Sequence, residues 1–583
     1  MENFLNFQKN INPDDQQIAE IIIKGIPSSP GVAIGQAAII EAEKIVLPNE
    51  RIPFEDIPDE IAKFEAAINE MTQEFIRVMN KVGEDDMNVK TVLETNLFII
   101  SDSVFTDSIK KRIKGGMSVE NAVIQEFEMQ ITFFKRSNDI LLRDRALDLQ
   151  HIMERLLAVL RNRCVYFAVN QGQIVVAQSI TPEDVVNFND SGIAAIVTEV
   201  GGISSHSSIL ARSFDIPSVL GIKNATQIIG HYSQIVVDGY SGTVIINPSE
   251  QTIEKYEKQK EFDNNYQKEL GKLIKVTAAT IDKRRIRTQA IVGFPEDVDA
   301  AAKAGAEGVG LVRSENILNF RDDFPDEYEQ TEWYSEIADR AYPSEVIIRA
   351  FDVGSDKFAP GIPRHESNPA LGFRGIRFLL QRNDVFLTQI KAVLRASKYK
   401  NVKFMLPMVA NLREITQSKI LIEKAKEILK QENQDFDQKM PFGIMIETPA
   451  AVILAERFAE ECDFFSIGTN DLTQYALAAD RTNEMVNEYY DDFHPAIIRM
   501  LKMVLDAAKK RKIPVSICGE IAGHAAATNL LIGLGFSDLS VSPPSILELK
   551  KRILEVNFKK AEKFARQVLK CSSHSEVRDL IES

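Results

Sequence analysis

The sequence predicts a multidomain α/β protein that ends in a (β/α)8 TIM-type barrel. The chain has 583 residues, which is enough for two to four domains with cores of their own. Beyond residue 276, eight short apolar segments alternate with helix-length segments, the pattern typical of a (β/α)8 barrel. Periodicity alone also fits an open doubly wound sheet, but the count of eight favours the closed barrel.

Composition and charge narrow the class of protein. Hydrophobic residues make up 44% of the chain and charged residues 26%, as in soluble globular proteins, and the net charge of -15 argues against a nucleic-acid partner. The cysteines are far apart and form no CxxC pair, which favours a reducing compartment. The N-terminus does not resemble a signal peptide, and we find no uncharged apolar run of about 18 residues. We therefore expect a cytoplasmic protein with no membrane span.

The part before the barrel divides into segments of different pattern. Residues 1–24 are predicted to be a polar extension. Residues 25–42 and 166–248 contain short strand-like runs broken by Gly and Pro, which predicts one α/β domain. Between them, residues 43–165 carry apolar residues at three- and four-residue spacing with little Gly or Pro, which predicts an inserted helical bundle.

A linker and the barrel complete the chain. Residues 249–275 are highly charged and contain no internal proline, which predicts an exposed linker helix before a barrel domain of residues 276–583. The predicted barrel strands are Arg287–Val292, Gly308–Val312, Val346–Phe351, Val402–Met408, Phe442–Ile446, Phe464–Ile467, Val515–Cys518 and Leu539–Val541.

Polar side chains follow several of these strands at their carboxyl ends, where barrel proteins carry their functional residues. Glu447 follows the fifth strand, and Asn470 and Asp471 follow the sixth. The two carboxylates suit Mg²⁺, which takes few protein ligands and keeps water or substrate phosphate in its other positions. Each acid could instead cap a helix or pair with an arginine.

Arginines and a thiol are expected at the same end. Arg313, Arg349 and Arg481 offer permanently charged forks for phosphate or carboxylate, although an arginine in a loop is often a surface ion pair. Cys518 ends the seventh strand. By default it is a small buried hydrophobe, but beside a metal it becomes a candidate proton donor, because a thiol is mostly protonated at neutral pH.

A second candidate site lies at residues 201–212, which read GGISSHSSILAR. The paired glycines permit a tight turn after a strand, and the hydroxyls that follow can cap a helix that opens near His206. An imidazole at a helix N-terminus is a plausible nucleophile for phosphate, since the helix dipole favours the attached anion. The alternative is a capping turn that includes a histidine by chance.

From about residue 25 to the C-terminus, the chain resembles Enzyme I of the bacterial phosphoenolpyruvate:sugar phosphotransferase system, the phosphoenolpyruvate–protein phosphotransferases. The resemblance rests on motifs that occur in the family's order, namely SPGVAIG, GGISSHSSILAR, GAEGVGLVRSE, IIRAFDVGSDK, NPALGFRGIR, IETPAA, FFSIGTNDLTQY and ICGEIAG. IGTNDLTQY is close to diagnostic. Departures from the family pattern include Ile203, Asn316 and Ser355.

The resemblance implies a role for each candidate residue. His206 would be phosphorylated through Nε2 by phosphoenolpyruvate, and Cys518 would protonate the enolate to give pyruvate. The substrate would be held by Arg313, Arg349, Asn470, Asp471 and Arg481, and Mg²⁺ would be bound by Glu447 and Asp471. The family then passes the phosphoryl group to a histidine of the carrier HPr, which docks on the helical insertion. Family members dimerise through the barrel, and the phosphohistidine α/β domain swivels.

Two other functions remain open at this point. Pyruvate,phosphate dikinase and phosphoenolpyruvate synthase share the histidine domain and the barrel, but they need a nucleotide-binding domain, and this chain has no Gly-rich phosphate loop. The other is a regulatory or catalytically degenerate relay component that docks HPr-like partners. The presence of His206, Glu447, Asp471 and Cys518 together argues against degeneracy.

Overall fold

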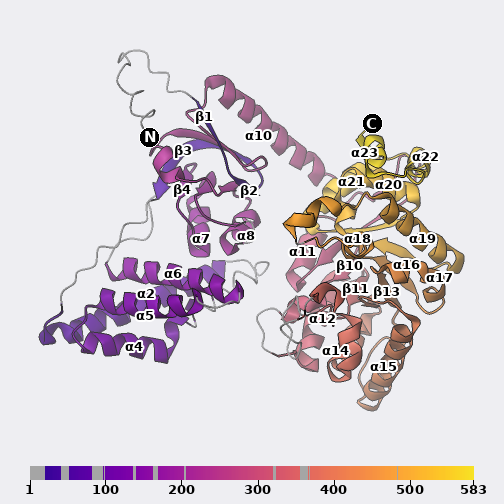
Figure 1. The fold of residues 1–583 in the computed structure, drawn as a ribbon, viewed down its shortest axis with the longest axis horizontal. Coiled ribbons are helices and arrows are strands. Elements are labelled where there is room, and N and C mark those ends of the chain that lie inside the picture. Colours follow the sequence, from indigo (N-terminus) through magenta and orange to yellow (C-terminus); the bar gives the residue numbers. More distant parts are fainter. Residues whose placement is uncertain are drawn as a thin grey trace. The chain divides into compact units, whose positions relative to one another are not determined.

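The computed structural model describes residues 20–40, 51–81, 93, 96, 97, 99–135, 140–161, 169–202, 205–318, 323–354, 366, 368–481 and 483–582. The chain forms two compact units, Met1–Asn265 and Tyr266–Ser583, which we describe separately (Figure 1). The boundary falls within helix α10 (Glu250–Gly271), inside the segment predicted as a linker helix.

The first unit is built on an eight-stranded sheet with the order β1-β8-β7-β3-β4-β5-β6-β2. The run β3-β4-β5-β6 is parallel, and the remaining neighbours pair antiparallel. The strands are β1 (Ile21–Lys24), β2 (Ile26–Ser29), β3 (Val32–Ile40), β4 (Ile174–Ala177), β5 (Ala195–Thr198), β6 (Ser218–Leu220), β7 (Gln234–Asp238) and β8 (Thr243–Ile246). β1 covers the last four residues of the predicted N-terminal extension. Its three consecutive isoleucines favour a strand that pairs with β8.

Helices cover the first unit's sheet and form the predicted insertion. α2 (Ile57–Lys81), α4 (Ser103–Lys114), α5 (Val119–Lys135) and α6 (Ile140–Leu160) lie side by side (Figure 1). α7 (Pro182–Ser191), α8 (His206–Ser213) and α9 (Ala225–Ile228) follow sheet strands. Apolar side chains of the insertion, such as Phe64 and Leu156, belong to one buried cluster with Val175 and Ile196 of the sheet. The insertion and one face of the sheet therefore share a hydrophobic core.

The second unit contains the predicted barrel, and its eight parallel strands close on themselves in the order β10-β11-β12-β13-β14-β15-β16-β9. The strands are β9 (Arg287–Val292), β10 (Val309–Val312), β11 (Val346–Arg349), β12 (Val402–Leu406), β13 (Phe442–Ile446), β14 (Phe464–Ile467), β15 (Val515–Ile517) and β16 (Asp538–Val541). The fold class predicted from sequence is thus confirmed. Several strands end one or two residues before the predicted limit, because the chain there leaves the sheet to enter the loops at the carboxyl end of the barrel.

Helices surround the barrel strands (Figure 1). They are α11 (Pro295–Lys303), α12 (Glu327–Ala341), α13 (Ile376–Gln381), α14 (Asn383–Ala396), α15 (Leu412–Gln431), α16 (Pro449–Ile453), α17 (Ala455–Phe458), α18 (Thr469–Leu477), α19 (Pro495–Arg511), α20 (Ala527–Leu534), α21 (Ile546–Glu555), α22 (Phe558–Val568) and α23 (His574–Glu582). One large apolar cluster fills the layer between strands and helices, and a smaller one, which includes Leu311, Met405, Met445, Phe464 and Cys518, fills the barrel lumen.

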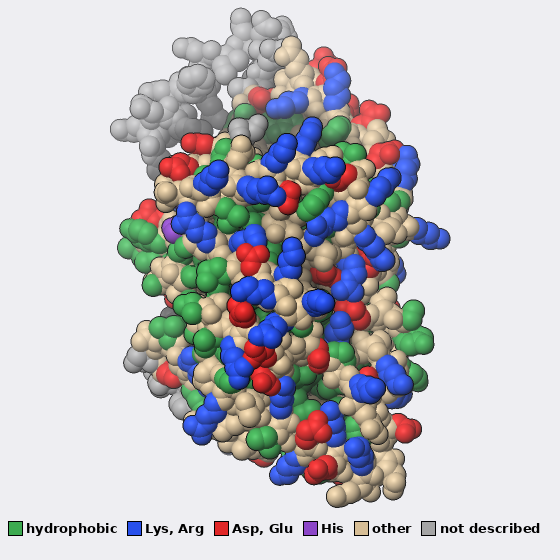
Figure 2. Space-filling model, turned by 90° about the vertical axis from the view of Figure 1, so that its right-hand side faces the viewer, with side chains coloured by type: hydrophobic (Ala, Val, Ile, Leu, Met, Phe, Trp, Pro, Cys, Tyr) green, Lys and Arg blue, Asp and Glu red, His purple; other side chains and the backbone are tan. Residues whose placement is uncertain are grey.

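One face of the molecule is drawn in Figure 2. On this face, basic and acidic side chains are interspersed with isolated apolar ones. Among the described residues, no helix combines the length and the apolar character needed to cross a membrane.

Candidate active site

A cavity of about 430 Å³ opens at the carboxyl ends of the barrel strands. Its lining includes three arginines and five carboxylates together with a thiol. The lining residues are Leu311, Arg313, Glu315, Arg349, Asp352, Met445, Glu447, Gly468, Asn470, Asp471, Arg481, Tyr490, Cys518, Gly519 and Glu520. The structure therefore brings together every site residue predicted in the barrel.

Glu447 lies directly after β13 and is fully buried. Its Oε1 accepts a hydrogen bond from the backbone N–H of Met408 at 2.5 Å, while Oε2 has no hydrogen-bond partner among the residues that the structure describes. Gly468 leaves room beside this oxygen, since a Cβ at that position would lie 2.9 Å from Oε2. A buried carboxylate oxygen without a donor is costly, so a ligand of positive charge is expected here.

Asp471 is the second carboxylate of this kind. It lies in the first turn of α18 and is buried, and within the described part of the chain its Oδ1 also lacks a hydrogen-bond partner. Burial raises the pKa of Glu447, and the negative charges of Asp471 and Asp352 raise it further, against the opposing charge of Arg349. The two acids therefore repel each other without a cation between them.

The donor set fits one divalent cation. The other three carboxylates of the cavity have partners, because Glu315 and Asp352 pair with arginines and Glu520 bonds to Asn470. Among the described residues, no group of three or more His, Cys, Asp and Glu side chains is arranged to hold a metal ion. Two carboxylates suffice for a hard cation such as Mg²⁺, whose other positions are taken by water or by substrate phosphate.

Arg349 is held firmly at the floor of the cavity. It ends β11, is 6% exposed, and forms an ion pair with Glu315 and another, at 3.4 Å, with Asp352. Asp352 also pairs with Arg374 at 2.9 Å. Burial lowers the pKa of Arg349, but the charge of Glu315 and the other acids outweighs this and raises it overall, so the guanidinium stays charged. Arg349 is thus a fixed positive charge for an anion in the cavity.

Arg313, Arg481 and Asn470 line the open side. Arg313 follows β10, Arg481 follows α18, and both are exposed. The Asn470 side chain exchanges two hydrogen bonds with Glu520, because its Nδ2 donates to Glu520 Oε1 at 2.8 Å and its Oδ1 accepts from the Glu520 backbone N–H at 2.8 Å. Tyr490 donates to the Asn470 carbonyl at 3.2 Å. Asn470 is therefore fixed in orientation at the cavity wall.

Cys518 directly follows β15 and is 5% exposed. Burial raises the pKa of its thiol to about 11, although a hydrogen bond from Ser466 and the charge of Arg349 act in the other direction. The thiol is therefore protonated at neutral pH and can give up a proton inside the cavity.

The predicted nucleophile belongs to the first unit. His206 is the first residue of α8, and Ser205 caps this helix by accepting from the Ser208 N–H at 3.3 Å. The preceding turn uses Gly201 at a φ of +151°, a conformation that favours glycine. The side chain of His206 and residues Ile203 and Ser204 lie outside the described part of the chain.

Sequence reasoning named the cavity's main residues but missed how they are supported. It did not identify the pairing of Arg349 with Glu315, the bonds between Asn470 and Glu520, or any role for Tyr490 and Ser466. A signal existed for Ser466, since a serine in the apolar strand segment FFSI is unusual at a buried position. The other pairs join residues far apart in sequence, and no local pattern marks them.

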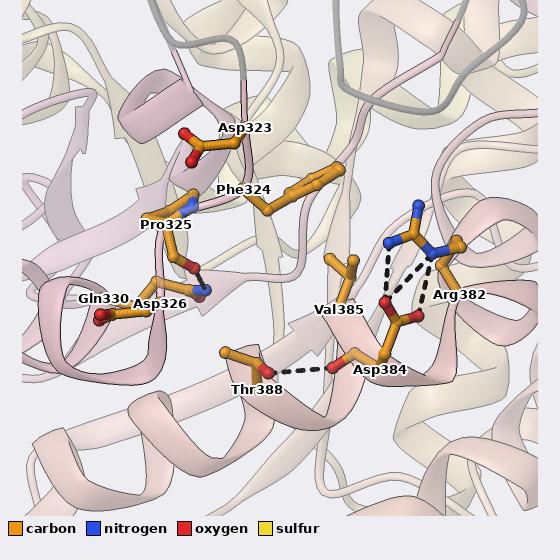
Figure 3. Close-up of a pocket in the computed structure, with 9 residues that line it drawn as sticks. All are labelled: Asp323, Phe324, Pro325, Asp326, Gln330, Arg382, Asp384, Val385 and Thr388. Atoms are coloured by element: carbon orange, nitrogen blue, oxygen red, sulfur yellow. Dashed lines mark hydrogen bonds and ion pairs between the residues drawn. The ribbon is translucent and has the colours of Figure 1, made fainter.

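A second cavity of about 420 Å³ lies on the outside of the barrel, near the start of α12 and α14. Figure 3 shows that its polar groups bond to one another. Arg382 pairs with Asp384, Thr388 donates to the Asp384 carbonyl, and Gln330 donates to the Pro325 carbonyl. The one arginine among the described residues of this lining is already paired with Asp384, so this cavity offers less to an anionic substrate than the one at the strand ends, which holds three arginines.

Comparisons with known proteins agree with this geometry. Three family models match, described as PEP-utilising enzyme, N-terminal, over residues 24–145, PEP-utilising enzyme, mobile domain, over residues 169–242, and PEP-utilising enzyme, PEP-binding domain, over residues 267–558. The last of these contains the whole cavity.

Two relatives that match over nearly their full length carry the same name. The phosphoenolpyruvate-protein phosphotransferase of Priestia megaterium is 35% identical over 570 residues, which cover 96% of this chain and 98% of that protein. The one of Listeria monocytogenes is 36% identical over 567 residues, with the same coverage. A solution structure of Enzyme I (nEIt) has 31% sequence identity and a TM-score of 0.36, and covers 41% of this chain and 99% of that one. This chain belongs to the family of phosphoenolpyruvate-protein phosphotransferases, the Enzyme I proteins of the phosphotransferase system.

Proposed function

We propose that the protein transfers the phosphoryl group of phosphoenolpyruvate to its own His206, releases pyruvate, and then passes the group to a histidine of HPr. Family membership and one observation support this. Two buried carboxylates, Glu447 and Asp471, each leave an oxygen without a partner in a cavity that also holds three arginines and a buried thiol. This set suits a trianionic substrate that binds together with a cation.

In the first transfer, different residues of the chain hold different sides of the substrate. Arg349, fixed by Glu315 and Asp352, holds the anionic substrate from the floor of the cavity, and Arg313 and Arg481 do so from its open side. Asn470 contributes amide donors whose direction is set by Glu520. Fixed donors need no reorganisation as charge moves during the reaction, which is the main source of catalysis in phosphoryl transfer.

We assign the cation to Glu447 and Asp471 and identify it as Mg²⁺, whose preference for oxygen ligands and water matches this pair. When bound, it supplies positive charge to the phosphoryl oxygens. In the step itself, Nε2 of His206 forms a bond to phosphorus while the bond from phosphorus to the enolate oxygen breaks. The S–H bond of Cys518 then breaks as its proton bonds to C3 of the enolate, which gives pyruvate.

The first unit then delivers the phosphoryl group. We propose that residues 25–42 and 166–248 form the phosphohistidine domain, that residues 43–165 dock HPr, and that α10 links them to the barrel. His206 at the start of α8 has the helix N–H groups beside it, and these favour the attached phosphate. We further propose that the protein is a cytoplasmic homodimer that associates through the barrel, as the family resemblance implies.

The test is incubation of the full chain with ³²P-labelled phosphoenolpyruvate and Mg²⁺, with and without chelator. We expect acid-labile label that requires the metal and is absent from His206→Ala. Addition of HPr should move the label onto HPr.

His206→Asn serves as a second variant of similar size, so that loss of label does not depend on one substitution. Absence of label on well-folded wild-type protein would contradict the proposal and would favour a degenerate relay component. Label that survives in both His206 variants would place the acceptor elsewhere.

A further inference from the structure

Two serine hydroxyls lie behind the thiol of Cys518 and form a chain of hydrogen bonds that ends on its sulfur. Ser466 Oγ donates to Cys518 Sγ at 3.2 Å. Ser516 Oγ in turn donates to Ser466 Oγ at 3.0 Å. Ser466 and Ser516 face each other in register on the neighbouring parallel strands β14 and β15. Both hydroxyls therefore direct their donors toward the sulfur.

On the side of the barrel lumen, the surroundings of the sulfur are apolar. Cys518 packs in the lumen cluster with Leu311, Met445 and Phe464. Ser466 is 0% exposed and Ser516 6% exposed, so bulk water does not reach the hydroxyls. The thiol's own hydrogen points to the carbonyl of Ile467, with Sγ 3.5 Å from the oxygen. Once the thiol has given up its proton, that carbonyl can no longer bond to the sulfur, and the Ser466 hydroxyl is a donor that can.

We propose that Ser466 is a positioning residue for proton delivery by Cys518, and that Ser516 fixes the direction of the Ser466 hydroxyl. This inference rests on the proposed function. When the proton moves to C3 of the enolate, the S–H bond breaks and its electron pair stays on sulfur. Ser466 keeps its own proton and bonds to the thiolate through it. The thiolate regains a proton from the water that enters when pyruvate leaves.

Electrostatics agree with the geometry. Burial is the largest influence on the Cys518 thiol and raises its pKa, whereas the hydrogen bond from Ser466 is the first of the influences that lower it. A serine that only filled space in the lumen would need no particular direction of its hydroxyl. A matched case exists in Ser540 of β16, which is equally buried, but its Oγ has no hydrogen-bond partner among the described residues.

The test compares alkylation of Cys518 in full-length wild type and Ser466→Ala, without metal or substrate. Iodoacetamide reacts with the thiolate, and peptide mass spectrometry reads Cys518 separately from the other cysteines. A lost hydrogen bond to a charged group shifts a pKa by about one to two units, and the higher nucleophilicity of the more basic thiolate offsets about half of this. We therefore expect alkylation of Ser466→Ala to be about three- to tenfold slower than that of wild type at pH 8.

Pyruvate formation should fall by a similar factor in Ser466→Ala, with the KM for phosphoenolpyruvate unchanged. Ser466→Thr, which keeps the hydroxyl, should restore both rates, and Ser540→Ala should leave both unchanged. Loss of packing alone would open the site and speed alkylation, which is the opposite sign.

The proposal is overturned if Ser466→Ala reacts as fast as wild type or faster, or if Ser540→Ala slows alkylation equally. Should Ser466→Ala fail to fold, Ser516→Ala carries the test, with about two- to threefold slower alkylation expected and no change as the contradicting result. Wild-type protein that forms no pyruvate would instead refute the proposed function, and the alkylation rates would still report on the hydrogen-bond chain.

Discussion

The two ends of the barrel both carry clusters of charged side chains. In only one of these clusters are all the charged groups paired with one another. At the amino ends of the strands, Arg287 pairs with Asp538 and, at 3.0 Å, with Glu345, and Lys403 pairs with Glu345, also at 3.0 Å. At the carboxyl ends, Glu447 and Asp471 each keep an oxygen for which no described residue supplies a hydrogen bond.

The pKa values of Glu345 and Glu447 differ between the two ends in the same way. Burial pushes the pKa of Glu345 up, but the charges of Lys403 and Arg287 outweigh it and hold the pKa below its ordinary value. Burial and the neighbouring acids raise the pKa of Glu447. The amino end thus uses charge for stability, whereas the carboxyl end keeps a charge imbalance that a ligand must correct. At the carboxyl end, the two acids with an unsatisfied oxygen lie together in one cavity, which marks a candidate functional site more clearly than burial alone.

The largest effect is expected for Glu447→Gln. The amide cannot replace a carboxylate as a cation ligand, so the rate of pyruvate formation should fall by about 10³-fold. Stability without metal should stay equal or rise, because the substitution removes a buried acid that lacks a partner. A coupled pyruvate assay and thermal unfolding without metal measure the two quantities. A fall in both the rate of pyruvate formation and the thermal stability would mean that Glu447 stabilises the fold, as Glu345 does.

Glu345→Gln should show the reverse behaviour. Two cations then lose a shared partner, and the barrel unit should lose about 2–3 kcal/mol of unfolding free energy. Pyruvate formation by the folded protein should stay close to wild type. Urea unfolding measures the change, and Arg382→Ala is the control, since its exposed pair with Asp384 should contribute less than about 1 kcal/mol. Equal losses of unfolding free energy in Glu345→Gln and Arg382→Ala would show that the ion pairs of Glu345 stabilise the protein no more than a surface pair does.

Binding of a divalent cation should strengthen as the pH rises. Glu447 has a pKa raised from 4.5 to about 8, so below that value the metal-free carboxyl carries a proton that the cation must displace. Affinity should therefore rise by up to about tenfold per pH unit below this pKa and level off above it. Calorimetric titration with Mg²⁺ in buffers of different ionisation enthalpy measures the proton released. Affinity that does not vary between about pH 6 and 8 would show that Glu447 is already ionised.

The smallest effect is expected at Glu520, which orients Asn470. Glu520→Ala removes one acceptor of the Asn470 amide and should raise the KM for phosphoenolpyruvate about two- to tenfold, with a smaller change in kcat. Glu520→Gln keeps an acceptor oxygen and should behave like wild type. If Glu520→Ala and Glu520→Gln raise the KM equally, the charge of Glu520 matters and its bond to Asn470 does not.

The fold followed closely from the sequence, because barrel strands buried on both sides form apolar runs that stand out. Phe442–Ile446 and Phe464–Ile467 were predicted with the limits that the structure has. The boundary of the predicted polar extension lies after the strand Ile21–Lys24 and not before it, because four residues beside a polar segment give a weak signal.

The site was predictable as a set of residues but not as a network. Strand ends identify Glu447 and Arg349, since parallel strands bring their carboxyl ends together. Which acid has a partner depends on residues far away in sequence. Glu315 meets Arg349 only across strands, and Glu447 Oε2 lies beside Gly468, where an added Cβ would be only 2.9 Å away. The sequence pattern within a strand contains no information on such pairs.

The most direct test of the contrast between the two ends is the position of a bound cation. Crystals of the full chain grown with Mn²⁺, as an anomalous scatterer in place of Mg²⁺, and phosphoenolpyruvate would show it. We predict one strong anomalous peak per chain, bound by Glu447 Oε2 and Asp471 Oδ1, and its loss in Glu447→Gln. A peak at the Glu345 and Asp538 end, or none beside Glu447 in wild type, would contradict the account.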